Sequence, residues 1–450
     1  MAGGNFDINQ KKVRPGSYKN YSAKQKLQIS TSTRGKVVIP LVGYDWGPSG
    51  EFIKLTLDSP DAEYAKLGRS VLDVDNESKT FPILLAFENA SEVYVYIVSG
   101  GSKKATMKQG ELTITAKYPG TRGNDITVVS TSNVDGGFDI TVYLEGDLME
   151  TFSGCETIEE LTEIGSEYVD FSGNGNLTAF AGAILEGGEN ATTNNVDFTT
   201  FLDKVEKVKC NTVLIPVSED ALVNAAASKL KYLRSKVGKT VQFVFAHFAG
   251  DHMGIINVTN AFAFDGIELT DVQAAAWVAG VTAGADKVTS NTYKVVNRAT
   301  AVLREKSNEE AEAAILAGEF FFSTSDDTGE VIVEYDINSL VHPDKKQDDS
   351  YKKNRVVRVM DSFSDDLDAT IKPNQFDNEP NGWDKMEQLG RLLLKRYSNT
   401  NGGDGAIKNV DADNDFTVDR EKSEGDGTYF NVALQPVDSA EKLYYSISTQ

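Results

Sequence analysis

The spacing of apolar residues along this chain constrains its fold more than any single motif. Short segments at 112–118, 124–130 and 138–144 alternate apolar with polar residues, and Gly-containing turns separate them. A period of two over segments of this length is typical of strands with one buried face. We therefore expect a small all-β insertion, with bounds of 111–190.

Beyond the insertion, the pattern changes to buried strands that alternate with helices. Continuous apolar runs at 211–217 and 240–246 predict strands, and the segments at 219–235 and from about residue 271 predict helices. Strands and helices in alternation are typical of a parallel sheet covered by helices. The fold class is therefore α/β within an α+β multidomain chain, and this central segment forms a central α/β domain.

The segments that flank this central part contain further elements. The run at 36–43 predicts a strand, but Pro40 cannot donate a ladder hydrogen bond, so we place this strand at a sheet edge or a bulge. A helix around 81–89 and a strand at 93–98 follow. In the last third, we expect strands at 331–337 and 355–361, an amphipathic helix at 383–397 and a final strand.

The amphipathic helix is apolar on one side and basic on the other. Arg391 and Lys395 lie one turn apart on the basic side. This side is either a docking surface or a solvated face, and the solvated face is the default for a single helix. The apolar side is made by Trp383, Met386, Leu389, Leu393 and Tyr397.

Length and charge exclude several classes of protein. A chain of 450 residues predicts two to four domains. A net charge of -22 argues against a nucleic-acid partner, because phosphate neutralisation needs a surplus of Lys and Arg. The first residues lack the apolar core of a secretory signal, and no run of 18 apolar residues occurs. We expect cytoplasmic synthesis and no membrane insertion.

Motifs for nucleotides and calcium are incomplete. The segment 237–240 ends like a phosphate-binding loop, but Leu233 occupies the position of the first glycine, and a strand follows where a helix should begin. The loop from Asp411 has the first three ligand spacings of a calcium loop, but Phe416 replaces the required glycine and Lys422 the final glutamate. We therefore expect no cofactor and no metal.

A catalytic role has one weak candidate. His247, Asp251 and His252 follow a predicted strand and could hold a metal or transfer protons, although loop packing is the favoured interpretation. The alternative function is thus an α/β enzyme of unknown substrate with a site near His252 and Asp251. Cys155 and Cys210 form no CxxC pattern, which indicates neither a disulfide framework nor a thiolate site.

Seven segments, in order, resemble the family of contractile tail sheath proteins, which includes myovirus-type phage tails and R-type bacteriocins. The resemblance covers most of the chain, and the loop at 411–426 fits it less well. The matching segments are PGSY at 15–18, RGKVVIPLVGYDWGP at 34–48, TAKYPGTRGNDITV at 115–128, GDHMGIINV at 250–258, AAAWVAGVTAGADKVTSNTY at 274–293, IVEYDINSLV with YKKNRVVRVMDSF at 332–363, and PVDSAEKLYYSI at 436–447.

The resemblance implies a structural subunit and not an enzyme. Such subunits form stacked helical rings, expected to be hexameric, around a tail tube, and they contract to drive the tube through a target envelope. The implied partners are further copies of the chain, the tail tube protein, and baseplate and tail terminator proteins. The chain would be made in the bacterial host cytoplasm and become part of a phage tail or bacteriocin particle. A third hypothesis is an extracellular adhesin built around the all-β insertion.

The resemblance also implies an inner α/β domain built from the N- and C-terminal segments. We expect Arg391 and Lys395 to face the tube. The resulting division is an arm at 1–20, an N-terminal core part at 21–110, the β insertion at 111–190, a central domain at 191–330, a tube-proximal domain at 331–435 and a linking strand at 436–450.

Both chain ends are predicted to link neighbouring subunits by strand addition. In the C-terminal run, Leu443, Tyr445 and Ile447 alternate with Tyr444 and polar residues, which suits a strand with one buried face. A lone strand at a chain end needs a partner, and a neighbour's sheet edge provides one. The N-terminal arm, around Val13, Tyr18 and Tyr21, lacks a core-forming pattern of its own and is expected to pair in the same way.

Overall fold

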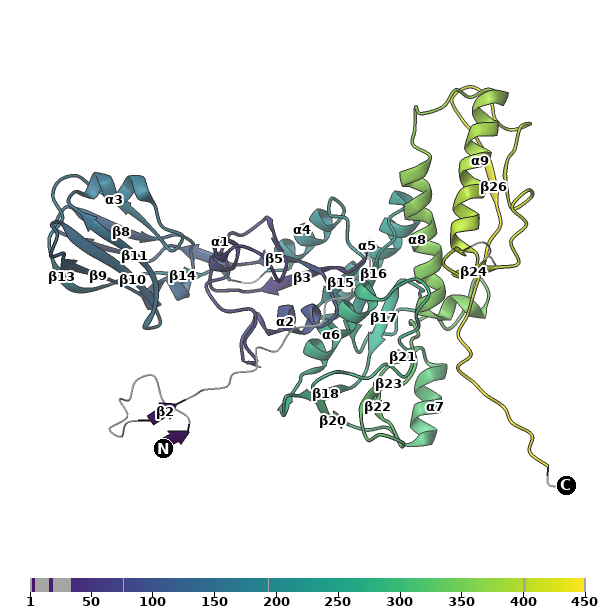
Figure 1. Cartoon of the computed structure of the whole chain (residues 1–450), viewed down its shortest axis with the longest axis horizontal. Coiled ribbons are helices and arrows are strands. Elements are labelled where there is room, and N and C mark those ends of the chain that lie inside the picture. The colour runs from purple at the N-terminus through teal and green to yellow at the C-terminus, as the bar shows by residue number, and fades with distance from the viewer. Residues whose placement is uncertain are drawn as a thin grey trace.

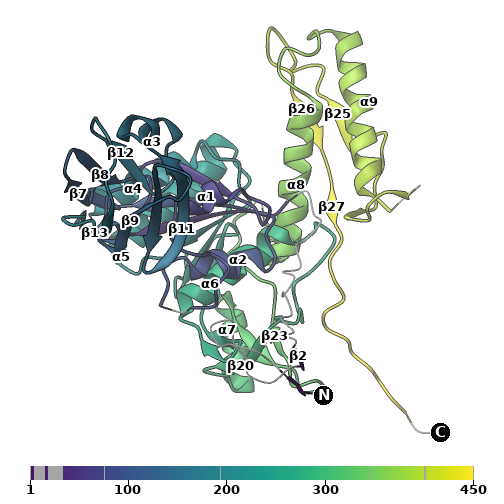
Figure 2. The ribbon, with the colours of Figure 1, turned by 60° about the vertical axis from the view of Figure 1, so that its left-hand side comes forward.

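The computed structural model describes residues 2–4, 16–18, 34–75, 77–192, 194–345, 347–399 and 402–448. The molecule is elongated: a β-rich domain forms one end, an α/β body the middle and a unit with two long helices the other end (Figure 1). The last described residues run away from the body in both views (Figures 1 and 2). The mixed α/β class with a β insertion is confirmed.

The α/β body is built on a seven-stranded sheet of order β21-β17-β16-β15-β3-β5-β4. All neighbours are parallel except β4 and β5, which confirms the predicted parallel sheet. The strands are β3 (Lys36–Val42), β4 (Phe52–Leu55), β5 (Glu92–Val98), β15 (Thr212–Ile215), β16 (Gln242–Ala246), β17 (Ile255–Val258) and β21 (Glu319–Phe320).

Helices cover both faces of this sheet. Helices α2 (Phe81–Phe87) and α6 (Asp271–Gly284) pack together on one face, while α4 (Asn195–Val205) and α5 (Asp220–Tyr232) share a core with the other face. A capping box between Thr270 and Gln273 fixes the start of α6. Short helix α1 (Asp61–Ala65) follows β4, and a π-turn (Leu233–Val237) extends α5.

Gly280 lies inside the apolar helix α6, at its crossing with α2. A Cβ atom at Gly280 would lie 2.3 Å from the carbonyl oxygen of Ala86 in α2. The glycine therefore allows the two helices to cross closely. Among the described residues, no helix combines the length and hydropathy needed to cross a bilayer.

The position predicted for the Pro40 strand is wrong, because β3 lies inside the sheet and not at an edge. The amide of Gly43 and the carbonyl of Gly35 bond to β5, whereas the carbonyl of Lys36 bonds to Asn211 on the β15 side. Alternation therefore turns the nitrogen of Pro40 toward β15. Pairing with β15 ends at Val38, so no ladder bond is lost at Pro40.

The β insertion is a sandwich of two antiparallel sheets, of order β11-β10-β9-β13 and β12-β8-β7. The three predicted alternating segments form β8, β9 and β10, whose apolar residues face the core. Its elements are β6 (Gly101–Lys103), β7 (Thr106–Gln109), β8 (Leu112–Ala116), β9 (Ile126–Ser132), β10 (Phe138–Leu144), β11 (Asp147–Cys155), α3 (Ile158–Ile164), β12 (Val169–Ser172), β13 (Phe180–Ile184) and β14 (Glu189–Asn190), with a 3-10 turn (Thr121–Asp125).

A small lobe, drawn below the central sheet in Figure 1, carries two further ladders, β19-β18-β20 and β22-β23. It includes helix α7, whose first turn has a capping box between Ser307 and Glu310. The elements are β18 (Ala261–Phe264), β19 (Ile267–Glu268), β20 (Ala299–Leu303), α7 (Asn308–Leu316), β22 (Phe322–Thr324) and β23 (Val331–Val333).

The C-terminal unit corrects the prediction of a strand at 355–361, because this segment lies in helix α8 (Asn354–Thr370). Val356, Val359 and Phe363 have helical spacing and are all buried, so tertiary packing overrides the β-propensity of valine. The predicted amphipathic helix is confirmed as α9 (Pro380–Tyr397). A 3-10 turn (Asp349–Lys352) precedes α8, and β24 (Ile407–Lys408), β25 (Phe416–Val418), β26 (Phe430–Val432) and β27 (Gln435–Pro436) follow α9.

The N-terminal segment contributes to a different domain from the one expected. Its strands β3, β4 and β5 complete the central sheet instead of forming an inner domain with the C-terminal segment. The reason is the direct ladder between β3 and β15. Before them, β1 (Ala2–Gly4) and β2 (Gly16–Tyr18) pair in parallel.

Candidate functional site: the extended C-terminal segment

The C-terminal segment is firmly anchored as far as Lys442. Strand β27 pairs with β24, and the amide of Val437 donates to the carbonyl of Ala406. Lys353, at the start of α8, then holds two carboxylates, Asp438 at 2.7 Å and Glu441 at 2.5 Å. Glu441 also accepts a 2.7 Å hydrogen bond from Ser290. Residues 435–442 are thus fixed to both the C-terminal unit and the α/β body.

Electrostatics reinforce this anchor. Burial alone would lower the pKa of Lys353, but its hydrogen bonds to Asp438 and Glu441 outweigh burial and raise the pKa. The Lys353 ammonium and that of Lys442 also lie over the ring of Tyr335, at 5.4 and 5.8 Å from its centre. Sequence reasoning missed these anchors. The charged residues Asp438, Glu441 and Lys442, just before the alternating run at 443–448, were a usable signal.

After Lys442, the chain leaves the surface as a short arm, residues 443–448. The predicted face of the arm is uncovered in this single chain: Leu443 is 64% exposed, Tyr445 78% and Ile447 93%. Tyr444, on the opposite face, is equally exposed at 89%. The alternation expected of a half-buried strand is therefore present without any covering surface.

The N-terminal arm residues are only partly placed. Val13 and Tyr21 lie outside the described residues, and Tyr18 is the last residue of β2. Their predicted role as linking residues stays a prediction.

A buried polar interface joins the C-terminal unit to the α/β body. Arg234, in the π-turn, donates to both carboxylate oxygens of Asp361 in α8 at 2.7 and 3.0 Å. Arg358 in α8 pairs with Asp336 at 2.8 Å, and both side chains are almost completely buried. Asn354 also donates to Asp336, at 3.0 Å. Helix α8 is therefore held to the body by specific polar bonds and not by apolar packing alone.

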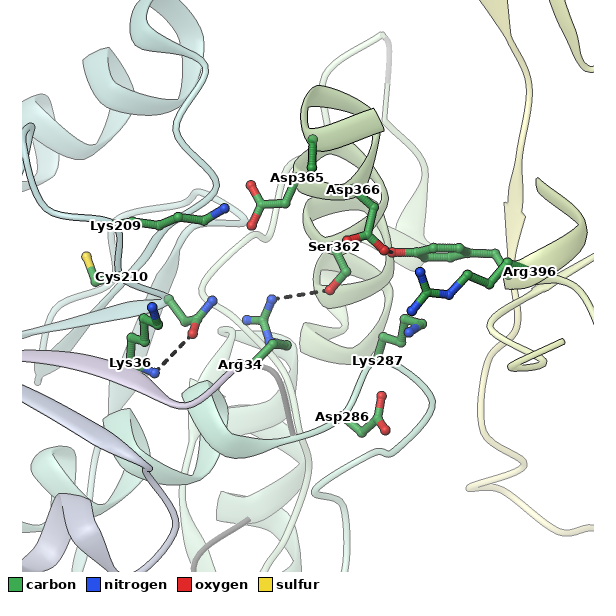
Figure 3. A pocket seen from close by; sticks show the side chains of 13 residues that line it. Arg34, Lys36, Lys209, Cys210, Asp286, Lys287, Ser362, Asp365, Asp366 and Arg396 are labelled. Atoms are coloured by element: carbon green, nitrogen blue, oxygen red, sulfur yellow. Dashed lines mark hydrogen bonds between the residues drawn. The ribbon is translucent and has the colours of Figure 1, made fainter. Parts of the chain in front are cut away.

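Beside this interface lies a charged cleft of about 330 Å³. Figure 3 shows its side chains coming from the sheet on one side and from α8 on the other, with Arg34 donating to Ser362 at 3.3 Å. Burial lowers the pKa of Arg34 to about 10, against the opposing effect of Asp361. The charged lining is Arg34, Lys36, Lys209, Lys287 and Arg396 with Asp286, Asp365 and Asp366.

The basic side of α9 is less uniform than its sequence indicates. Arg391 is partly covered and lies 3.5 Å from both Glu387 and Asp413, whereas Lys395 is exposed. Leu392, beside them, is 62% exposed. Of the two residues predicted to face the tube, Lys395 is the more accessible.

The residues of the two incomplete motifs, for nucleotides and for calcium, make structural hydrogen bonds. Lys239 donates to the carbonyls of Val205 and Val208, at the end of α4, so its ammonium caps that helix. The carboxylate of Asp411 accepts from the amide of Asp413 and the side chain of Asn414 within its own loop. The part of the chain that the structure describes contains no cluster of three or more potential metal-ligand side chains.

The histidines of the enzyme hypothesis do not converge on one site. His247 pairs with Asp271 at 2.7 Å, while Asp251 pairs with His342 at 2.9 Å. His252 accepts a hydrogen bond from the amide of Gly254, and burial lowers its pKa to about 4. These bonds hold the loop after β16. Cys155 and Cys210 are buried free thiols.

Family comparisons match consecutive parts of the chain. The phage tail sheath protein β-sandwich domain matches residues 98–190, the central domain 191–339 and the C-terminal domain 346–450. The phage-like element PBSX protein XkdK of Bacillus subtilis is 33% identical over 99% of each chain. The chain therefore belongs to the phage tail sheath protein family and is a structural sheath subunit.

Solved structures of sheath proteins resemble this chain in fold. The crystal structure of a sheath tail protein from Desulfitobacterium hafniense is 33% identical, with a TM-score of 0.79 over 96% of this chain and 99% of that one. The contracted helical sheath of the anti-feeding prophage has the same fold, at 13% identity and a TM-score of 0.55 over 98% of this chain and 100% of that one.

Proposed function

We propose that this chain polymerises as stacked helical rings around a tail tube and contracts to drive the tube through a target envelope. The work would come from free energy stored in contacts between subunits, without a catalytic step in the chain. Its partners would be further copies, the tube, and baseplate and terminator proteins, within a phage tail or bacteriocin particle. Rings of this kind need heterologous contacts, in which one patch binds a different patch on the neighbour.

The arm at 443–448 is the observation that carries this proposal. It is uncharged, it alternates apolar and polar side chains, and it follows directly on a segment held by Lys353. An anchored base and an uncovered tip suit a strand that joins the sheet of another copy. The N-terminal arm, with Val13, Tyr18 and Tyr21, would link copies in the same way.

Short ladders in the C-terminal unit are suitable partners for the arm of a neighbouring copy. The pairs β24–β27 and β25–β26 are two-stranded, and isolated two-stranded ladders are weakly stable. Among the described residues, β26 pairs with β25 alone, so its other edge is open to a further strand, and Asn431 and Val432 on it are exposed. A strand added from a neighbour would stabilise the ladder and link the two subunits at once.

The tube would meet the exposed side of α9. Lys395 and Arg391 would approach an acidic tube surface there, as repeated weak charge contacts that set register more than affinity. The division of the chain at 20, 110, 190, 330 and 435 remains part of the same proposal.

Truncation tests the arm directly. We would compare a chain that ends at Lys442 with a control that ends at Ser448, each mixed with the tube protein and examined by negative-stain microscopy. The control should form hollow tubes, and the shorter chain should remain a folded, soluble subunit. Equal tube formation would refute the linking role of the arm, while failure of the full-length chain to polymerise on any tube would refute the proposed function itself.

A further inference from the structure

One side of the α/β body is basic, although the whole chain is strongly acidic. The net charge is -22, but residues 204–239 contain eight Lys or Arg against three Asp or Glu. Lys231 and Lys236, at the end of α5 and in the π-turn, are exposed. Among the described residues, the carboxylates of this region pair with Lys229 and Arg234 instead. The charges of Lys231 and Lys236 are therefore available to a partner.

Two apolar side chains lie among these lysines. Tyr232, the last residue of α5, and Val237, the last residue of the π-turn, are both exposed. Protein interfaces commonly combine an aromatic or aliphatic centre with a charged rim. We call Lys231, Tyr232, Lys236 and Val237 the basic surface.

The small lobe carries a surface of opposite charge. Residues 307–330 contain seven Asp or Glu and no Lys or Arg. In α7, Glu309, Glu312 and Leu316 follow one another at helical spacing and are all exposed. The two aspartates at 326–327, between β22 and β23, are exposed as well. We call Glu309, Glu312 and Leu316 the acidic surface.

The cations just before α7 do not neutralise this surface. Arg304 pairs with Asp271, and Lys306 pairs with Glu319 at 3.3 Å. In the part of the chain that the structure describes, no Lys or Arg forms an ion pair with the two glutamates of the acidic surface. Each surface thus offers unpaired charge of one sign together with exposed apolar side chains.

The two surfaces lie on opposite sides of the body. Helix α5 shares a core with one face of the central sheet, whereas β18, β22 and β23 of the lobe share a core with α6 on the other face. Figure 1 draws α5 above the sheet and α7 below it. One chain cannot bring its own two surfaces together, but a second copy can. Such a contact is heterologous, so it repeats from copy to copy and suits an open polymer.

We propose that the basic surface of one copy docks on the acidic surface of the next copy. Leu316 packs against Tyr232 and Val237 at the centre, and the lysines and glutamates pair around them. The charge pairs select the partner surface and set its register more than they add affinity. The inference rests on the proposed polymerisation, and it adds a contact that is separate from the C-terminal arm.

Charge reversal on each surface tests the contact. One variant carries Lys231→Glu with Lys236→Glu, and the other carries Glu309→Lys with Glu312→Lys. Each variant places like charges opposite one another, so the subunit concentration needed to form tubes on the tube protein should rise roughly tenfold or more. Sedimentation of the polymer at physiological ionic strength measures this concentration, and circular dichroism checks that each variant is folded.

A combined variant and a matched control complete the design. The chain with all four substitutions has complementary surfaces again, so it should form tubes at nearly the concentration of the unaltered chain. The control carries Glu156→Lys with Glu163→Lys, two exposed positions of the β sandwich with the same change of net charge, and should assemble normally.

The outcomes separate this inference from the proposed function. If the unaltered chain forms no tubes on any tube protein, the proposed function itself is wrong. If the unaltered chain assembles, normal tubes from either reversed variant would overturn the docking contact. Failure of the folded four-substitution chain to regain assembly would overturn it too, because the two surfaces would then bind different partners.

Discussion

Replacing Asp361 by leucine should loosen α8 from the α/β body. Asp361 is 6% exposed and its partner Arg234 10%, so the substitution leaves a guanidinium buried without its carboxylate. Loss of one member of a buried pair costs about 3–5 kcal/mol. Because about 1.4 kcal/mol corresponds to a factor of ten, amide exchange through local opening of α8 should accelerate by roughly two to three and a half orders of magnitude.

Hydrogen exchange with mass spectrometry is the suitable assay, because a multidomain chain does not unfold in a single step. Peptides from α6 provide an internal reference. Asp384→Leu is the matched control, since Asp384 pairs with Arg420 where both are about half exposed, and such pairs contribute about 1 kcal/mol or less. The double variant Arg234→Met with Asp361→Leu should recover most of the loss. Equal exchange in α8 of the Asp361 and Asp384 variants would refute the reasoning.

Three further outcomes are expected. Proline at Tyr445 or at Ser446 should impair polymerisation in at least one case, because alternate amides face a partner strand, whereas Ser446→Ala should assemble normally in the same microscopy assay. Reversing Arg391 and Lys395 to Glu should weaken co-sedimentation with the tube, with Lys395→Glu alone giving most of the effect; unchanged binding across a range of salt would remove this contact. Burial lowers the pKa of His252 to about 4 from about 6.5, so the unfolded state binds more protons between these values and stability should fall by roughly 1–3 kcal/mol as the pH drops through them. As the pH drops through this range, the thermal midpoint of the His252→Asn variant should therefore fall less than that of the unaltered chain. Parallel curves of midpoint against pH for the two proteins would contradict this.

Elements with a single clear period could be predicted from the sequence. The alternating segments became β8, β9 and β10, and the apolar runs of the body became parallel strands. The start of α6 was also predictable, because a threonine and a glutamine three residues apart satisfy each other's backbone at a helix start. In each case, the local pattern and the tertiary environment favour the same structure.

Elements whose pattern fits two structures could not be assigned. The valines of α8 suit a strand by propensity and a helix by spacing, and partners distant in sequence, such as Asp336 and Arg234, decide between them. Pro40 is tolerated inside the sheet because β15 stops pairing two residues earlier. The anchors of the arm join Lys353 to Glu441, a contact that no local pattern contains.

The position of residues 443–448 in the assembled sheath tests the central claim most directly. A cryo-electron microscopy reconstruction of the polymer on its tube should show these residues as a strand, with main-chain hydrogen bonds to a ladder in the C-terminal unit of a neighbouring subunit. Density that shows the same residues free in solvent, without contact to a neighbouring subunit, would contradict the claim that the arm links the subunits.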